Sequence, residues 1–498
     1  MPRHSADTAA SVLLTGARVH GHPQPVDVLL EGGQIAGIGA IDAEQAQPAE
    51  IIDIAGRWLI PGLWDHHVHF TQWSLGAQRL DISSAFSASE TAQLVGAALL
   101  AMPQPLDPDL PLLGVGFRDG LWPDAPTVEL LDAAADAHPV VLVSADLHAV
   151  WLNTAALNKY GHEGHPTGLL REDEAFEITR RIGTVPDEIV DGWVLDAAAQ
   201  AAARGVVGIV DLEMSWNLDV WRRRIDAGFS DLRVEFGIYT EHLDRAIDQG
   251  LHTGQQFGEL LSVAGYKVLT DGSLNTRTAY CFEEYPGLEG LESSRGMLTV
   301  SGDELHSLMA KAVAAGIMPI VHAIGDHANR LALDAFEELG CAGRIEHAQL
   351  LDAADVARFA ALNVEASVQP DHAMDDRDVA EKHWHGRTDR AFALRSLVDA
   401  GATLRLGSDA PVSALDPWVT MAAAVFRARD GRDSWHPEQA ISAEQALAAS
   451  VRTSVSVGER ADLVIVDIDP LQAGLDELTR MPVAGTLLGG RFTYREGV

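Results

Sequence analysis

The residues best suited to chemistry are two histidines separated by a single residue. His67 and His69 lie in Asp65-His66-His67-Val68-His69, directly after the apolar run Trp58-Leu59-Ile60-Pro61-Gly62. Successive side chains of a strand point to opposite faces, so His67 and His69 share one face, whereas His66 is expected to face away and to pack. Two imidazoles on one face at a strand end are a typical pair of metal ligands. The pair therefore predicts a metal site at the end of an early strand.

Four more ligand-type residues follow the same local pattern. Lys267, His322, His347 and Asp409 each stand at or near the end of a short apolar segment, with a turn to follow. Catalytic residues of a (β/α)8 barrel come from the C-terminal ends of several different strands. The repeated order of strand, ligand and turn therefore favours an α/β fold with a TIM-like barrel.

The strand-like runs outnumber the strands that such a barrel needs. Ten runs are found, at 59–69, 111–116, 140–144, 206–211, 233–239, 265–271, 318–323, 343–348, 363–369 and 402–408. The stretch 75–200 interrupts the alternation with Ala- and Leu-rich helical segments and a Pro-rich run, so we interpret it as an insertion after strand 1. It takes the two surplus runs, 111–116 and 140–144. Lys267 then lies on strand 4, His322 on strand 5, His347 on strand 6 and Asp409 on strand 8.

The two ends of the chain share a different pattern. Short strand-like segments punctuated by Gly, Pro and Asp occur before residue 59 and again after residue 458. We expect one small β-sandwich-like domain built from 1–58 and 459–498, with the barrel occupying 59–458. Two independent β-rich additions are the alternative.

Composition narrows the class of protein. The chain has 498 residues, and its 72 Asp and Glu against 36 Lys and Arg give a net charge of −36, which disfavours nucleic acid as a partner. Its two cysteines, Cys281 and Cys341, exclude a disulfide framework. No run approaches the roughly 20 apolar residues of a membrane helix, and no signal peptide is recognised. These features predict a cytoplasmic protein with no membrane partner that acts on a small molecule.

The motifs around these residues resemble those of the amidohydrolase superfamily. Within it, the chain is similar to the YtcJ-like branch, which belongs to amidohydrolase family 3 and includes N-substituted formamide deformylases. The resemblance rests on Pro61-Gly62-Leu63-Trp64-Asp65-His66-His67-Val68-His69, Tyr266-Lys267 with Asp271-Gly272-Ser273-Leu274, His322-Ala323-Ile324-Gly325-Asp326, Ile345-Glu346-His347-Ala348 and Gly407-Ser408-Asp409-Ala410-Pro411. It extends over nearly the whole chain.

The resemblance implies a centre with one or two divalent metals. His67 and His69 would bind the first metal with Asp409, and His322 and His347 the second. Lys267 would be carboxylated and bridge the two, because an ammonium would repel a metal whereas a carbamate is an anionic oxygen ligand. Zinc suits this ligand set best, with manganese, iron or cobalt as alternatives. A metal-activated hydroxide would attack, with Asp409 orienting it and moving its proton.

Other residues are candidates for substrate contact. These are His148 and Trp151 in the insertion, Arg277 after strand 4 and His372 after strand 7. Each also has a structural interpretation, as a local hydrogen bond, a core aromatic or a salt bridge. Lys267 has one as well, as an ordinary lysine paired with Asp271.

Three functions follow from these expectations. The first is a hydrolase cleaving a non-peptide carbon–nitrogen bond in an amide, formamide or cyclic amide. The second is a deaminase of a ring amidine, with one metal and an uncarboxylated Lys267. The third is a barrel without catalysis that serves as a binding scaffold. A homo-oligomer is expected by analogy with superfamily members.

Overall fold

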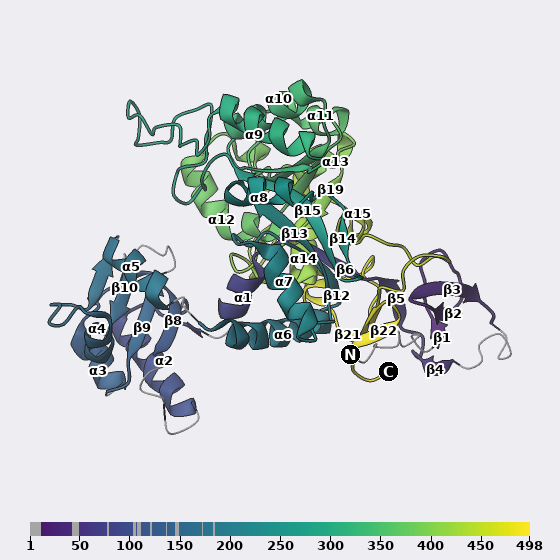
Figure 1. The fold of residues 1–498 in the computed structure, drawn as a ribbon, viewed down its shortest axis with the longest axis horizontal. Coiled ribbons are helices and arrows are strands. Elements are labelled where there is room, and N and C mark those ends of the chain that lie inside the picture. The colour runs from purple at the N-terminus through teal and green to yellow at the C-terminus, as the bar shows by residue number, and fades with distance from the viewer. Residues whose placement is uncertain are drawn as a thin grey trace. The chain divides into compact units, whose positions relative to one another are not determined.

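A computed structural model gives the fold of the chain (Figure 1). It describes residues 11–41, 49–76, 79–102, 106, 111–119, 122–135, 137–144, 149–171, 173–182 and 185–498. No described helix is both long enough and apolar enough to cross a membrane.

A parallel β-barrel forms the centre of the larger part of the chain. Its eight strands run in sequence order around the barrel, each hydrogen-bonded to the next. They are β6 (Leu63–Val68), β12 (Val206–Asp211), β13 (Arg233–Tyr239), β15 (Leu261–Leu269), β16 (Pro319–Ala323), β17 (Gly343–His347), β18 (Val364–Val368) and β19 (Leu404–Leu406). The predicted TIM-like barrel is therefore present.

Helices follow most of these strands, as the alternating pattern predicts. They include α7 (Asn217–Asp226), α8 (Leu243–Asp248), α9 (Gly302–Ala314), α10 (Asp326–Leu339), α11 (Ala353–Ala361), α12 (Pro370–His383) and α14 (Pro417–Phe426). Caps define several of their first turns: the side chain of Ser301 accepts from Glu304 N at α9, and that of Asp352 accepts from Ala354 N at α11.

The barrel closes where the last strand meets the first. Asp409 N donates to His67 O at 2.7 Å, and His69 N donates to Ala410 O at 2.8 Å. Gly407 allows this approach, because a Cβ at that position would lie 2.6 Å from His67 N. Two candidate ligand segments are thus joined through their own backbones.

The predicted first strand, 59–69, is two strands. β5 (Trp58–Pro61) pairs with β20 (Leu463–Val466) in another sheet, and β6 enters the barrel. Gly62 separates them at a tight contact, where a Cβ would lie 2.5 Å from a Val207 methyl carbon. The apolar run that precedes the histidines therefore begins outside the barrel.

The two ends of the chain form two four-stranded sheets. One has the order β3-β2-β1-β4, from β1 (Val12–Ala17), β2 (Val26–Glu31), β3 (Gln34–Gly39) and β4 (Glu50–Asp53). The other has the order β22-β21-β20-β5, with β21 (Val483–Leu488) and β22 (Arg491–Arg495). Apolar side chains from both ends, among them Leu14, Val28, Leu463 and Leu487, share one buried cluster.

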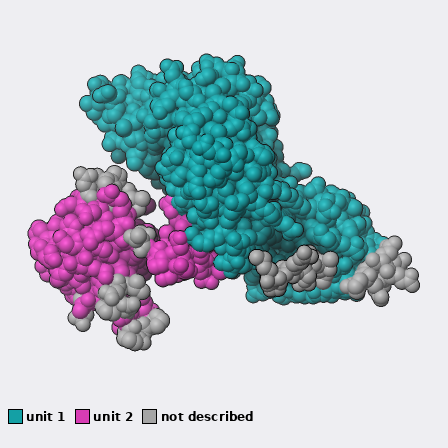
Figure 2. All heavy atoms as spheres, in the orientation of Figure 1, with its two compact units in different colours: residues 1–70, 198–498 teal, residues 71–197 magenta. Residues whose placement is uncertain are grey.

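Residues 71–197 form a compact unit separate from 1–70 and 198–498 (Figure 2). Its five-stranded sheet has the order β11-β10-β9-β8-β7, with β7 (Leu80–Asp81) and β11 (Leu169–Arg171) at its edges. β8 (Leu112–Phe117) and β9 (Val140–Ser144) correspond to the two surplus runs of the sequence, and β10 (Ala149–Leu152) contains Trp151. The unit has its own buried cores beside this sheet.

Candidate metal centre

The six predicted ligands lie at the C-terminal ends of their strands. His67 is on β6 and His69 directly follows it, Lys267 is on β15, His322 on β16 and His347 at the end of β17. Asp409 follows β19, at the seam where the barrel closes. The six residues are far apart in the sequence, but the parallel strands bring them to one end of the barrel.

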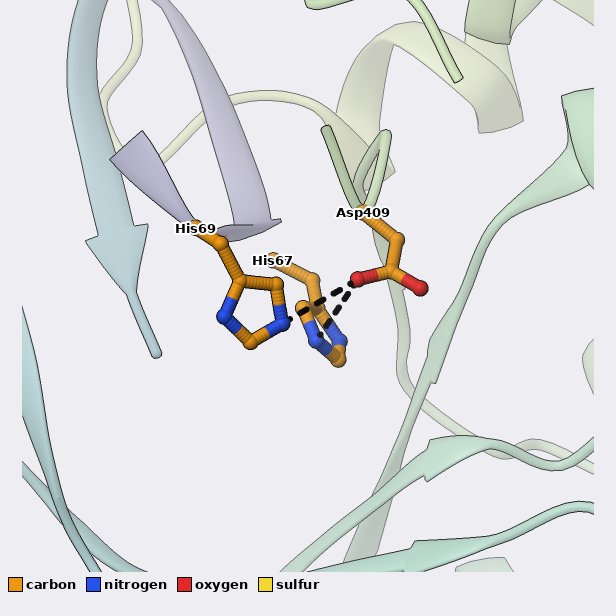
Figure 3. Close-up of side chains that lie close together, drawn as sticks. All are labelled: His67, His69 and Asp409. Atoms are coloured by element: carbon orange, nitrogen blue, oxygen red, sulfur yellow. Dashed lines mark ion pairs between the residues drawn. The ribbon is translucent and has the colours of Figure 1, made fainter. Parts of the chain in front are cut away.

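His67, His69 and Asp409 form one close group (Figure 3). The Nε2 atom of His67 is 3.3 Å from Asp409 Oδ1, and the Nε2 atom of His69 is 3.4 Å from the same oxygen. One carboxylate oxygen thus faces two imidazole nitrogens. Three such atoms converging on one point can hold a divalent cation.

A second group adjoins the first. The rings of His322 and His347 are 4.4 Å apart, and the rings of His347 and His67 are 5.0 Å apart. The Nε2 atom of His322 is buried without a hydrogen-bond partner among the described residues. An unpartnered buried nitrogen beside a second imidazole fits a second metal position.

Lys267 is the most unusual member of the cluster. Its side chain is 1% exposed, and its Nζ atom has no hydrogen-bond partner among the described residues. Its charge acts on four histidines of the candidate site, His322, His347, His67 and His69. Burial lowers the pKa of Lys267 to about 8, so the amine loses its proton more readily than a lysine in water.

The protonation states of several residues in the cluster favour the binding of a cation. Burial lowers the pKa of His322 to about 3, and burial also lowers the pKa of His347 and His67, so these imidazoles are neutral. Burial would raise the pKa of Asp409, but the neighbouring His67 and the hydrogen bond from His69 hold it well below its usual range. Neutral imidazoles with an ionised carboxylate are ligands that zinc prefers.

Two buried aspartates hold the backbone around the ligands. Asp65 Oδ1 accepts from His67 N at 3.1 Å and from Ser408 N at 3.0 Å, so it ties the first strand to the last. Asp271 accepts from Ile324 N, Gly325 N and Tyr280 N, which joins the segments after β15 and β16. Asp271 Oδ1 is 3.6 Å from His322 Nε2, and the Nζ atom of Lys267 hydrogen-bonds neither to Asp271 nor to any other described residue.

The four substrate-contact candidates have different locations. His372, in the first turn of α12, is 5% exposed, and its Nε2 atom is 3.9 Å from Asp409 Oδ2. Arg277 lies half-buried in the segment after β15, with φ 58°, and its charge acts on His383 of α12. His148 lies outside the described residues. His372 is thus the candidate that the structure places in the metal cluster.

Trp151 requires a correction. Its side chain is 0% exposed in the core of the 71–197 unit, and its Nε1 atom donates to Thr127 O at 3.1 Å. A fully enclosed ring with a satisfied donor offers no surface to a substrate. We therefore assign Trp151 to the core of that unit, because both faces of β10 are buried there.

Sequence reasoning missed Glu346. This carboxylate is 0% exposed, and its Oε2 atom is 2.7 Å from His67 Nδ1. Burial would raise its pKa, but the electrostatic interaction and hydrogen bond with His67 lower the pKa of Glu346 to about 2. Strict alternation places Glu346 and His347 on opposite faces, but His347 has φ 73° and has left the strand conformation. The sequence signal that could have identified Glu346 is its position directly before His347, a candidate ligand.

The chain belongs to the amidohydrolase family, whose model matches residues 50–494. Among its relatives is Protein LONG AFTER FAR-RED 3 of Arabidopsis thaliana, at 28% identity over 89% of this chain and 83% of that protein. Putative amidohydrolase YtcJ of Bacillus subtilis is 25% identical over 94% of this chain and 96% of its own length. N-substituted formamide deformylase of Arthrobacter pascens is 24% identical over 94% of both.

Solved structures agree with this assignment. A metal-dependent hydrolase from Pyrococcus horikoshii superposes with a TM-score of 0.77 at 25% identity, covering 94% of this chain and 99% of that chain. One from Pyrococcus furiosus gives 0.75 at 25% identity, covering 93% and 100%. The predicted family is therefore confirmed, and the chain is a hydrolase of that family.

Proposed function

We propose that this protein is a metal-dependent hydrolase that cleaves a non-peptide carbon–nitrogen bond in an amide, formamide or cyclic amide. The observation that carries the proposal is Lys267, a buried lysine with no hydrogen-bond partner among the described residues, which interacts electrostatically with four histidines and with Asp409. Burying an ammonium without a hydrogen-bond partner costs folding free energy. We therefore interpret Lys267 as a functional residue.

Two ligand sets fit the cluster. His67, His69 and Asp409 would hold one divalent metal, and His322 and His347 the other. Lys267, once carboxylated by carbon dioxide, would bridge them as an anionic ligand. Zinc is the metal we favour. A metal ion bound at this site would supply Lewis-acid chemistry, which polarises the scissile carbonyl and lowers the pKa of a water molecule.

Asp409 has the position of the proton-transfer residue. Its Oδ1 atom faces His67 and His69, whereas its Oδ2 atom faces His372 at 3.9 Å. One oxygen can therefore serve as a ligand while the other accepts a proton from the attacking water and passes it to the leaving amine. We assign to His372, which faces that second oxygen, the role of orienting the substrate.

Lys267 provides the test of this proposal. We would measure metal content per chain by elemental analysis after expression with zinc and bicarbonate, in the wild type, in Lys267→Ala and in Lys311→Ala. Lys311 is a matched lysine on the surface, half-exposed and paired with Asp244. We expect about two metals in the wild type and in Lys311→Ala, and fewer in Lys267→Ala.

Product analysis completes the experiment. Release of an amine and a carboxylate from a panel of amides and formamides supports the proposal. One metal that Lys267→Ala leaves unchanged, together with ammonia release from ring amidines, would establish the deaminase instead. No metal and no product from either panel would indicate a binding scaffold.

A further inference from the structure

The two nitrogens of the His67 ring face different acidic groups. Nε2 lies 3.3 Å from Asp409 Oδ1, on the side where the proposed metal would bind. Nδ1 lies 2.7 Å from Glu346 Oε2. The ring is therefore held at its Nδ1 side by a residue of β17.

The chemistry of Glu346 determines the proton on His67. An ionised carboxylate accepts hydrogen bonds and cannot donate them, so Nδ1 must carry the hydrogen. Nε2 of the neutral ring then presents its lone pair toward Asp409. A carboxylate that fixes the tautomer of a metal-binding histidine in this way also fixes the plane of its ring.

Glu346 has few other partners. Its Oε1 atom makes no hydrogen bond among the described residues, and the Nη1 atom of Arg344 lies 4.0 Å from it. Arg344 directs its Nε and Nη2 atoms to Glu365 instead. The hydrogen bond with His67 is thus the close contact of a fully buried carboxylate, whose burial without that contact would be unfavourable.

His69 differs from His67 in the hydrogen bonding of its Nδ1 atom. Its Nδ1 atom is buried and has no hydrogen-bond partner in the part of the chain that the structure describes. The two histidines of the first metal position are therefore supported unequally: His67 is oriented by a carboxylate, and His69 has no such support in the structure. Removing the support of His67 should have a large effect on that position.

We propose that Glu346 is a positioning residue that orients His67 and thereby sets the affinity of the first metal position. This inference rests on the proposed function, because it requires that a metal bind between His67, His69 and Asp409. Loss of an outer partner of this kind weakens metal binding by about 10–100-fold.

The experiment measures metal affinity and needs no substrate. Metal-free protein is titrated with Zn²⁺ against a chromophoric chelator, and separately with Co²⁺ while its visible spectrum is recorded. The proteins are the wild type, Glu346→Ala, Glu346→Gln and the control Glu235→Gln. Glu235 is a part-buried barrel carboxylate of β13 that pairs with Arg452 and touches no proposed ligand.

We expect Glu346→Ala to bind Zn²⁺ about 10–100-fold more weakly and to shift the Co²⁺ bands. Glu346→Gln keeps an acceptor oxygen but loses the charge, so its affinity should be intermediate. Glu235→Gln should bind as the wild type does. If Glu346→Ala fails to fold, the nearly isosteric Gln variant decides the question.

The experiment distinguishes a failure of this inference from a failure of the proposed function. Wild-type affinity and an unchanged Co²⁺ spectrum in folded Glu346 variants would overturn the inference alone and leave the proposed function intact. A wild type that binds no metal would overturn both.

Discussion

Asp409 is the residue at which the candidate metal ligands and the candidate substrate contact meet. One of its oxygens faces His67 and His69, and the other faces His372. It also has φ 57°, a left-handed conformation that is uncommon outside glycine and that is found at functional sites. The carboxylate therefore stands where the proposed mechanism needs both a ligand and a proton carrier.

Replacing Asp409 with Asn should abolish most of the activity. The amide is nearly isosteric but accepts a proton poorly, so we expect kcat to fall by about 10²–10⁴-fold and metal content to decrease. Steady-state kinetics and elemental analysis would check this, with Asp244→Asn as a surface control. Near wild-type kcat in Asp409→Asn would assign proton transfer to another residue.

At the scale of elements, the contact between β19 and β6 positions the first metal group. Gly407 and Asp65 both serve it: Gly407 leaves room for the His67 backbone, and Asp65 accepts from His67 N and Ser408 N. The barrel interior also contains charge, because Glu365 on β18 accepts from Arg344 on β17 and from Arg405 on β19. Precise closure and charge pairing between strands thus underlie the site.

Gly407→Ala tests the closure. The new methyl group would lie 2.6 Å from His67 N and 2.9 Å from His67 Cβ, so the strands must separate. We expect a loss of about 3 kcal/mol in unfolding free energy, with weaker metal binding, measured by denaturant unfolding and zinc titration. Gly474→Ala is the control, because it belongs to the same unit and a Cβ there would lie 3.7 Å from Glu477 Oε2, an ordinary contact. A Gly407 variant as stable as this control would refute the argument.

Glu365→Gln tests the charge pairing through pH. Burial would raise the pKa of Glu365, but the charges of Arg344 and Arg405 hold it below its usual value of 4.5. A depressed pKa means that the carboxylate stabilises the fold above about pH 4.5 and loses that contribution as the pH falls through its folded pKa. The stability difference between metal-free wild type and Glu365→Gln should therefore shrink on acidification. A difference independent of pH between 7 and 3 would contradict the pairing.

At the scale of the molecule, the chain has separate cores. The apolar cluster of the terminal sheets joins residues from both ends of the chain, and the 71–197 unit has cores of its own. The proposed metal ligands all belong to the other unit, 1–70 with 198–498. Damage to the core of 71–197 should therefore spare the metal cluster.

Trp151→Ala tests this independence. Removing a fully buried indole should cost about 3–5 kcal/mol within the 71–197 unit. We expect faster proteolysis within 71–197 while zinc content and the Co²⁺ spectrum stay as in the wild type. Loss of metal in proportion to the proteolysis would show that the two units unfold together.

Local sequence patterns predicted most of the candidate site residues. His67, His69, Lys267, His322 and His347 were chosen as candidate ligands from their places at or near strand ends, because a parallel barrel brings all strand ends of one direction to a single face. The eight barrel strands and the β-rich ends were likewise predicted from apolar runs and the turn residues between them. The type and order of the candidate ligands are therefore properties of the sequence itself.

Tertiary structure decided the features in which strict alternation fails. Between β6 and β12, the step from Asp65 to Val68 faces the shorter step from Ile209 to Asp211, so a bulge re-aims the histidines. His347 and Asp409 have positive φ, which no periodicity predicts. Glu346 reaches His67 across 279 positions of the chain, and Trp151 turned out to be core. These outcomes depend on register, closure and packing between distant segments, and local side-chain period carries no information about those.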